Sequence, residues 1–430
     1  MEQLSLDIEV GMFERLTEIH LLRRAAKSVL ANKGSAGIDG VTVEEYRTNL
    51  NDNLEEIIIE IKEWRYKPSP VRRVEIPKPG TNKTRQLGIP TIKDRVVQQA
   101  IRLIIEPLFE KEFHNNSYGF RPNRGQQNAI EQAKQYISEE GREWIIDIDL
   151  EKYFDTINHD RLITKLMVKI KDKRIIKLIA MILKSGSMQN EMFNASEQGA
   201  PQGSPLSPLL SNIYLHELDI ELDKRGLKFC RYADDCNIYV KSKKAAETRL
   251  TSITKFIEGK MKLKVNKEKS KATKSDKVKF LGISIINNIV VIATASTKRA
   301  MTKIKEIIPR RTHIPFDKQM LKVNQWYRGW SSYYRITEMP SQLRAIEAHI
   351  RRRFRAQFIA HSKRARTLHN KMHPSAGKPN VRNRGIWKTS NLRPVTLTWN
   401  NDWFERRGFK ITSSAKLQHW KPIDFWFNFT

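Results

Sequence analysis

The sequence predicts a mixed α and β fold, of the α+β class, in which a sheet-containing part is followed by a helical part. Three observations lead to this prediction. Strand-like alternation and helical periodicity are interspersed up to about residue 295. After about residue 296 the strand signals fade, and the chain becomes basic, aromatic and largely helical. The 430 residues, 39% of them hydrophobic, are enough for two to four domains with apolar cores.

The charge balance predicts a polyanionic partner. The formal net charge is +31 at pH 7, which exceeds what an ordinary solvated surface explains. Nucleic acid and an anionic membrane surface are the two candidates. Because no apolar run reaches the roughly 18 residues that a spanning helix needs, nucleic acid is favoured and no membrane partner is expected.

The cysteine content and the N-terminus indicate a cellular setting. Cys230 and Cys236 are the only cysteines, which excludes a disulfide framework and a zinc module of four cysteines. The first residues include acids where a transit peptide would carry arginines, and no apolar signal core follows them. We therefore expect a cytoplasmic protein without a cleaved leader.

The N-terminal third alternates helical and strand signals. Residues 11–32 carry apolar residues near the helical spacing of 3.6, and three glycines within 34–40 end that pattern. Two β-prone segments flank a turn within 71–90, which predicts a β-ribbon along which cations are spread. Residues 94–109 then form an amphipathic helical pattern.

Acidic residues stand on two predicted strand elements. Residues 144–150 alternate as a half-buried strand, with Asp147 and Asp149 on one face. A hairpin over 228–241 carries Asp234 and Asp235 at its tip. Other helices are predicted at 160–184, 206–224 and 243–261, and short strands near 278–284 and 288–293.

These carboxylates suit nucleotidyl transfer. That reaction uses two divalent cations roughly 3.5–4 Å apart, one at the attacking 3′-hydroxyl and one at the leaving pyrophosphate. Magnesium takes hard oxygen ligands, so two or three aspartates suffice. Taken alone, Asp234 and Asp235 could be an ordinary polar turn, because acids favour turns. The strand-turn-strand frame around them favours a Mg²⁺ site with Asp149 on the neighbouring strand.

The segment Arg231-Tyr232-Ala233-Asp234-Asp235 resembles the active-site box of bacterial group II intron reverse transcriptases. Further segments resemble that family's boxes in order and spacing, from about residue 10 to 410. They are Lys33-Gly34, Gly37 to Gly40, Ile76 to Pro79, Arg85 to Pro90, Ser117 to Pro122, Asp149 to Asp155 with Asn158-His159, Pro201 to Pro208, and Phe280 to Gly282.

The resemblance implies a role for particular residues. Asp149, Asp234 and Asp235 would be the catalytic metal ligands, with Asp234 bridging the metals and Asp235 assisting. Asp147 shares the face of Asp149, but the family's ligand stands five residues before the aromatic that is here Phe154.

The incoming dNTP would be held by residues outside the aspartate set. Lys78 and Arg85 match the family's cations that grip the triphosphate, although on a ribbon they could also be solvated charges. Phe154 would be the steric gate against a ribose 2′-hydroxyl, and Gln202 would contact the nucleotide. A core phenylalanine is the alternative for Phe154.

The basic C-terminal part resembles the thumb and maturase domain of the same family. Residues 326–335 interleave aromatic rings with cations, as a strand-binding surface or a helix-bundle core would. More arginines follow within 351–355 and fit phosphate neutralisation. The candidate nucleic-acid contacts are Arg328, Trp330, Arg351, Arg352, Arg353 and Arg355.

The resemblance also implies the domain organisation: an N-terminal extension (1–45), reverse transcriptase fingers and palm with an antiparallel sheet (46–295), an α-helical thumb (296–365), and a maturase-type RNA-binding region with the tail (366–430). The tail has no Cys pairs and no convincing His-Asn-His cluster, so we expect no DNA endonuclease domain. Its aromatic end, 420–430, departs from the family pattern and is unassigned.

The expected function is Mg²⁺-dependent synthesis of DNA from dNTPs on an RNA template with a DNA primer. Group II intron RNA and target DNA are the further expected partners, through assisted splicing and target-primed copying. Two alternatives remain open. One is a related polymerase of phage defence or of a retron. The other is an RNA-binding splicing cofactor whose polymerase is inactive.

Overall fold

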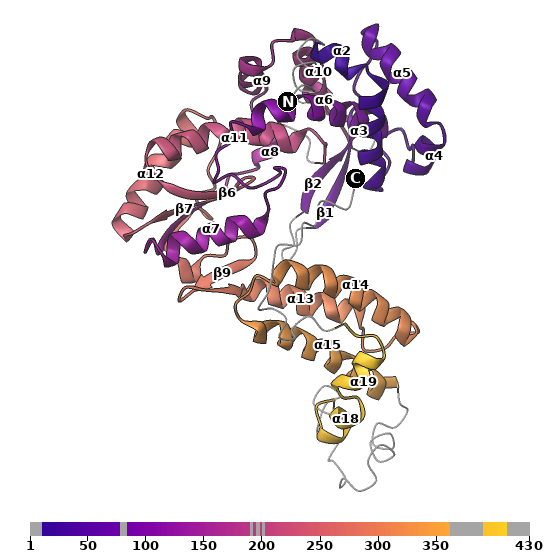
Figure 1. Cartoon of the computed structure of the whole chain (residues 1–430), viewed down its shortest axis with the longest axis vertical. Coiled ribbons are helices and arrows are strands. Elements are labelled where there is room, and N and C mark those ends of the chain that lie inside the picture. The colour runs from indigo at the N-terminus through magenta and orange to yellow at the C-terminus, as the bar shows by residue number, and fades with distance from the viewer. Residues whose placement is uncertain are drawn as a thin grey trace, which may run out of the picture. The chain divides into compact units, whose positions relative to one another are not determined.

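The computed structural model describes residues 11–77, 84–189, 192–194, 198–199, 203–361 and 390–410. The chain divides into two compact units, Met1–Lys274 and Ser275–Thr430 (Figure 1). The α+β class predicted from the sequence is confirmed. None of the described helices is long and apolar enough to cross a membrane.

The first unit begins with a helical layer. Its elements are α2 (Met12–Leu16), α3 (Ile19–Ala31), α4 (Val43–Thr48), α5 (Leu50–Lys62) and α6 (Ile92–Glu110). Helix α6 packs against α3 and α5, and its buried face includes the apolar residues predicted for it, among them Val97 and Ile101. The predicted ribbon is confirmed as the antiparallel pair β1 (Val71–Pro77) and β2 (Thr84–Ile89).

Short strands extend the ribbon into a sheet of order β2-β1-β4-β5, with β4 (Ser187–Gln189) and β5 (Met192–Asn194). The helix predicted at 160–184 is in fact two helices, α9 (His159–Lys169) and α10 (Lys173–Lys184). The side chain of Asp172 caps α10 by accepting a hydrogen bond from the Arg174 amide, which starts a new helix within the predicted one.

A second, fully antiparallel sheet forms the other part of this unit, in the order β6-β7-β3-β8. Figure 1 labels two of its strands, β6 and β7. Its strands are β6 (Lys228–Tyr232), β7 (Asp235–Val240), β3 (Trp144–Ile148) and β8 (Lys271–Lys274). Helix α7 (Gln126–Ser138) packs against β6, and α12 (Lys243–Gly259) packs against β3 and β8. Helix α11 (Ser207–Lys224) and the short α8 (Tyr153–Thr156) complete the unit.

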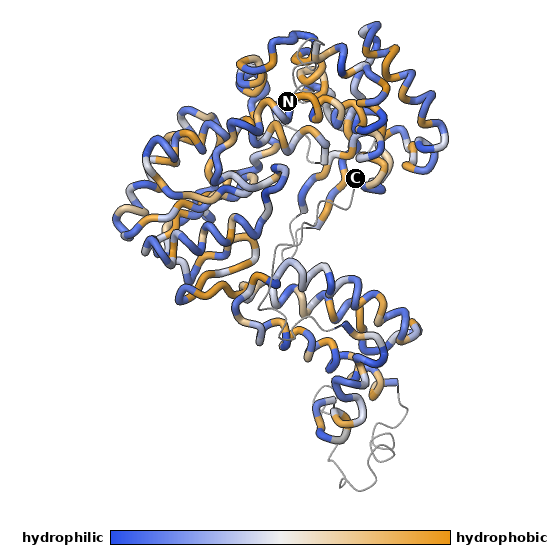
Figure 2. The backbone as a smooth tube through the Cα atoms, viewed as in Figure 1, coloured by the Kyte–Doolittle hydropathy of each residue, from blue (hydrophilic) through white to orange (hydrophobic). Residues whose placement is uncertain are grey.

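The second unit starts with the turn η1 (Ser275–Lys277) and the hairpin β9 (Ile283–Ile286) and β10 (Ile289–Ile292), and then becomes helical. Its helices are α13 (Thr294–Ile307), α14 (Phe316–Tyr334), α15 (Pro340–His361), α18 (Arg393–Thr398) and α19 (Asn401–Arg406). Polar and apolar segments alternate along its helices, as amphipathic packing requires (Figure 2). Its apolar core includes Ile304, Val323, Ile350 and Phe404.

Candidate active site

The strand register places two of the predicted aspartates at adjoining ends of two paired strands. Strand β3 is antiparallel to β7, and Ile148 pairs with Cys236. The paired register ends there: Asp149 is the residue after β3, and Asp235, the first residue of β7, is the residue before Cys236. Successive strand residues point to opposite faces, so Asp235 and the apolar Cys236 face different sides of the sheet.

Asp234 lies in the two-residue turn between β6 and β7. Tyr232 pairs with Asp235, which leaves only Ala233 and Asp234 in the turn. Ala233 has a φ of +58°, the left-handed conformation that tight hairpin turns require. The turn therefore places Asp234 beside Asp235 and next to the end of β3, as the sequence predicted for the hairpin tip.

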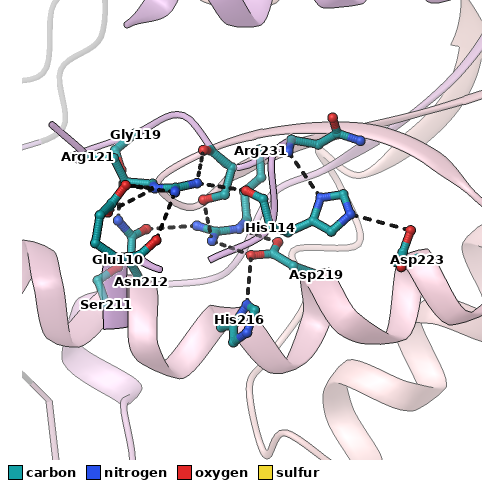
Figure 3. Close-up of polar contacts among 12 residues, drawn as sticks. Glu110, His114, Gly119, Arg121, Ser211, Asn212, His216, Asp219, Asp223 and Arg231 are labelled. Carbon is teal, nitrogen blue, oxygen red and sulfur yellow. Dashed lines mark hydrogen bonds and ion pairs between the residues drawn. The ribbon is translucent and has the colours of Figure 1, made fainter. Parts of the chain in front are cut away.

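A buried arginine, Arg231, holds this turn in place, and Figure 3 shows its contacts with Asp219 and Asn212. Arg231 is fully buried, and its guanidinium donates to both carboxylate oxygens of Asp219 at 2.6 Å. It also donates to the carbonyl of Ala233 at 3.0 Å, to Asn212 Oδ1 at 3.0 Å and to Ser117 Oγ at 2.7 Å. One side chain thus ties the turn to α11 and to the loop before α7.

The charges of this pair stabilise each other. Burial by itself would raise the pKa of Asp219, but the nearby Arg231 guanidinium outweighs it and holds the pKa below its ordinary value. Both groups are therefore ionised, and a bidentate arginine-carboxylate pair fixes orientation as well as distance. The sequence analysis did not predict this network, although an arginine between Cys230 and Tyr232 in a predicted strand was a usable signal.

Asp234 is an acid in a partly desolvated position. Burial raises its pKa above the ordinary value, and the charge of Asp149 adds to the rise. Two carboxylates that disfavour each other's ionisation are stabilised by a cation placed between them. Asp147 is half-buried, and burial also raises its pKa.

The segment that leads into β8 supplies a cation that the sequence analysis did not predict. The Lys269 ammonium lies 3.2 and 3.3 Å from the two carboxylate oxygens of Asp149. The Asp149 amide donates to Ser270 Oγ, and the Asn266 amide donates to the Asp149 carbonyl. Asp149 is therefore held on both sides of its backbone by the segment leading into β8.

The residues present fit a divalent cation. Asp149, Asp234 and Asp235 offer only hard carboxylate oxygens, the donors that Mg²⁺ takes. As the side chains stand, no group of three His, Cys, Asp or Glu within the described ranges is gathered closely enough to hold a metal ion. Binding at these aspartates would require Lys269 to release the Asp149 carboxylate.

Comparison with known proteins agrees with this geometry. The family model described as reverse transcriptase (RNA-dependent DNA polymerase) matches residues 76–285, and the one described as group II intron, maturase-specific domain matches residues 297–374. Protein YkfC of Escherichia coli is 35% identical over 311 residues, which cover 63% of this chain and 81% of YkfC. The chain belongs to the group II intron reverse transcriptase and maturase family.

A second relative is matched over a shorter stretch, and a solved structure is matched at much lower identity. The group II intron-encoded protein LtrA of Lactococcus lactis is 36% identical over 238 residues, covering 54% of this chain and 39% of LtrA. Telomerase from Candida albicans, solved with a fragment of telomeric RNA, gives a TM-score of 0.44 at 12% identity, covering 72% of this chain and 63% of that one. At these values the structural likeness adds nothing to the assignment.

Four residues of this group II intron reverse transcriptase were predicted to contact the dNTP, and the structure describes two of them, Arg85 and Phe154. Arg85 is exposed on β2, and Phe154 is half-buried in α8 with its ring edge-on to Tyr153. Lys78 and Gln202 lie outside the described residues. Their roles, like those of Arg85 and Phe154, stay predictions.

Two described glycines, Gly199 and Gly203, lie against the elements that carry Phe154 and Arg85. A Cβ on Gly199 would lie 2.9 Å from the Phe154 carbonyl oxygen, and a Cβ on Gly203 would lie 2.6 Å from the Gly88 carbonyl oxygen. Both glycines also have positive φ, at +96° and +108°. The chain therefore passes close to α8 and then close to β2, the two elements that carry Phe154 and Arg85.

The candidate RNA contacts on α14 differ in exposure. Arg328 is exposed. Trp330 is half-buried, with ring centroids 6.0 Å from Trp326 and 4.7 Å from Tyr334. The aromatic residues of 326–335 thus take part in packing, while Arg328 faces solvent.

The arginines of α15 are more deeply involved in the fold than the sequence suggested. Arg351 and Arg355 are each 8% exposed, and Arg355 donates to the Trp399 carbonyl at 2.8 Å. Arg353 donates to the Ile308 carbonyl at 2.6 Å, while Arg352 is half-buried. Burial lowers the pKa of Arg355 to about 10, which still leaves it cationic at neutral pH. Their proposed contact with RNA is untested.

Proposed function

We propose that this protein is an RNA-directed DNA polymerase of a group II intron. It copies an RNA template into DNA from a DNA primer, and it also binds the intron RNA, assists its splicing and supports its mobility by target-primed reverse transcription. The observation that supports the polymerase assignment is that Asp149 follows the end of β3 while Asp234 and Asp235 stand at the start of β7, the antiparallel neighbour of β3. The match to a group II intron maturase domain over 297–374 supports the RNA-binding role.

The chemistry follows from the arrangement of charge. Mg²⁺ held by Asp149, Asp234 and Asp235 would activate the primer 3′-hydroxyl and neutralise the leaving pyrophosphate. The protein's own contribution is mostly positioning. Arg231 fixes the turn of Asp234, while the segment around Ser270 fixes the backbone of Asp149. These contacts restrict the backbone positions of Asp149 and of the turn that carries Asp234.

The nucleotide would be held from the ribbon and from α8. Arg85 is free to contact the triphosphate because it is exposed on β2, and Lys78 would join it from the ribbon turn. Phe154 follows Asp149 by five residues and would press against the 2′ position of the sugar. A ribose hydroxyl would collide with that ring, so deoxynucleotides would be selected.

The double variant Asp234→Ala/Asp235→Ala tests whether one chain has two separable roles. Primer extension on an RNA template should be lost, while binding and splicing of the intron RNA should be retained. The helices that we propose to bind RNA belong to the second unit, and the substituted residues belong to the first. Equal extension by the wild type and the double variant would refute the assigned metal site.

A rival reading makes the protein a splicing cofactor without polymerase activity. The same assay separates it from our proposal, because a splicing cofactor would give no extension with either protein and tight RNA binding with both. A retron-type or phage-defence polymerase would extend primers but would show no preference for the intron RNA over an unrelated structured RNA. Our proposal requires both extension and that preference.

A further inference from the structure

The loop Ser117–Arg121 is packed directly against the turn that carries Asp234. The Tyr118 amide donates to the Arg231 carbonyl at 2.8 Å, and Asn212 Nδ2 donates to the Gly119 carbonyl at 2.8 Å. A Cβ on Gly119 would lie only 2.3 Å from the Ala233 nitrogen. Only glycine allows this approach, so the backbones of the loop and the turn are in contact.

Arg121 fixes the other end of the loop (Figure 3). Its side chain is 3% exposed and forms an ion pair with Glu110 at 2.7 Å. It also donates to the carbonyls of His114 and Ser117, at 2.7 and 2.9 Å. The Arg121 guanidinium makes these contacts within the protein and so fixes the loop. The backbone position of the adjacent Phe120 is fixed with it.

That neighbour, Phe120, is a large aromatic residue in a strained backbone conformation. Its φ is +60°, and its side chain is 42% exposed. The left-handed region is unfavourable for a residue with a Cβ, and such strain persists where the surroundings impose it, often at functional sites. Its ring lies 6.5 Å from that of Tyr232, the residue before the Ala233–Asp234 turn.

A second strained aromatic residue shows what a structural role looks like. Trp64 has a φ of +57° and is 38% exposed. Its ring stacks on Phe13 at 5.5 Å, and the Lys177 ammonium lies 4.4 Å from its centroid. The packing of α2 and α10 explains Trp64. Phe120 has no comparable stacked ring and cation in the described structure, and its ring lies beside the catalytic turn.

We propose that Phe120 is a stacking platform for the primer strand next to its 3′ end. This inference rests on the proposed polymerase function, because the primer 3′-hydroxyl must reach Asp149 and Asp234. A nucleotide at that position has its base and sugar close to the turn, and the turn is in contact with the Phe120 loop. Aromatic rings bind bases of any identity through their faces, as a polymerase that copies all sequences requires.

The informative variant is Phe120→Gly, because glycine accepts the positive φ without strain. We expect its melting temperature to match or exceed that of the wild type. Its affinity for a primer-template duplex, measured by fluorescence anisotropy without dNTPs, should fall about five- to a hundredfold, the range for losing one stacked ring. Phe120→Tyr retains a ring and should restore most of the affinity.

Two controls make the result specific. Val168→Ala truncates an apolar side chain of α9 that is even more exposed than Phe120, at 62%, and should leave the affinity unchanged. A 2-aminopurine at the last positions of the primer should be quenched by the wild type and by Phe120→Tyr, and less by Phe120→Gly. If Phe120→Gly melts early, Phe120→Asn, which also tolerates positive φ, replaces it.

Equal affinity and equal quenching for the wild type and a folded ring-less variant would overturn the inference. Failure of the proposed polymerase function would give a different result, since the wild type itself would then extend no primer. Because affinity is measured without dNTPs, loss of the stacking contact is seen separately from loss of catalysis.

Discussion

Arg231 shows how a single buried residue can decide the position of a catalytic turn. It is ionised in the core because Asp219 accepts hydrogen bonds from its Nε and Nη2 atoms, and its Nη1 atom donates to the Ala233 carbonyl. Removing one partner of such a pair leaves an uncompensated buried charge, at a cost of about 3–5 kcal/mol. The pair therefore supports both the fold and the site.

We predict that Arg231→Met lowers the free energy of unfolding by about 3–5 kcal/mol and raises the Mg²⁺ concentration needed for half-maximal primer extension. Urea denaturation and a Mg²⁺ titration measure the two effects. Arg225→Met is the matched control, because Arg225 pairs with Glu221 on the partly exposed face of α11 and should cost about 1 kcal/mol or less. An unchanged Mg²⁺ requirement in a folded Arg231→Met protein would contradict the positioning role.

His349 gives the second unit a dependence on pH. Burial, followed by the charges of Arg352, Arg353 and Lys305, lowers its pKa to about 4, below the unfolded value of roughly 6.5. The unfolded chain thus takes up a proton before the folded one, so stability falls as pH decreases from about 6.5 to 4. We predict a loss of about 2 kcal/mol, allowing for solvent screening.

Unfolding followed by tryptophan fluorescence between pH 7 and 4 measures this loss. His349→Gln does not titrate and should show a flatter pH profile over the same interval. If His349→Gln and the wild type have the same pH profile of unfolding, other groups control acid unfolding.

Local sequence patterns predicted the helices and strands that depend on nearby residues, and they missed a strand that depends on long-range pairing. The ribbon β1–β2, helix α6 and the 228–241 hairpin depend on nearby residues and were predicted. Strand β8 has the sequence Lys-Ala-Thr-Lys, which lacks apolar alternation, and it becomes a strand by pairing with β3 more than 120 residues earlier. Long-range pairing of this kind leaves no local pattern.

In the candidate site, too, residues marked by a local pattern were predicted, and residues that act through distant contacts were not. Asp149, Asp234 and Asp235 were proposed from a strand pattern, a turn and a resemblance, and the register of β3 and β7 brings their positions together. Lys269 and the Arg231 network could not be derived in that way, because each makes contacts that are distant in sequence. On α15, helical spacing did not distinguish the buried Arg351 and Arg355 from outward cations, since both belong to a run of arginines.

The ribbon allows a test at the scale of an element. Arg85→Ala should raise the KM for dNTPs and lower kcat/KM about 10- to 100-fold, the value of a hydrogen bond to a charged group. Arg73→Ala is the control, because Arg73 lies on the paired strand and donates to Gln86 Oε1 at 2.6 Å. Steady-state kinetics with varied dNTP concentration measure both variants. An equal effect of the two substitutions on kcat/KM would show that Arg85 stabilises the ribbon and does not bind the dNTP.

At the scale of the whole molecule, the net charge of +31 predicts strong electrostatic binding of RNA. The logarithm of the association constant should fall linearly with the logarithm of salt concentration. Arg328→Gln should make that slope shallower by about one, because Arg328 is exposed on α14. Lys243→Gln, on α12 in the first unit, is the control for a general charge effect. Identical slopes for the wild type and Arg328→Gln would remove Arg328 from the interface.

The central claim is that Asp149, Asp234 and Asp235 form the metal site of a reverse transcriptase, and primer extension tests it most directly. A DNA primer annealed to an RNA template is incubated with dNTPs and Mg²⁺, with the wild type and with Asp234→Ala. We predict extension by the wild type that depends on Mg²⁺, and extension at least a thousandfold slower with Asp234→Ala, on the order of 4 kcal/mol of lost transition-state stabilisation. Extension by Asp234→Ala at the wild-type rate, or none by a folded, RNA-binding wild type, would contradict the claim.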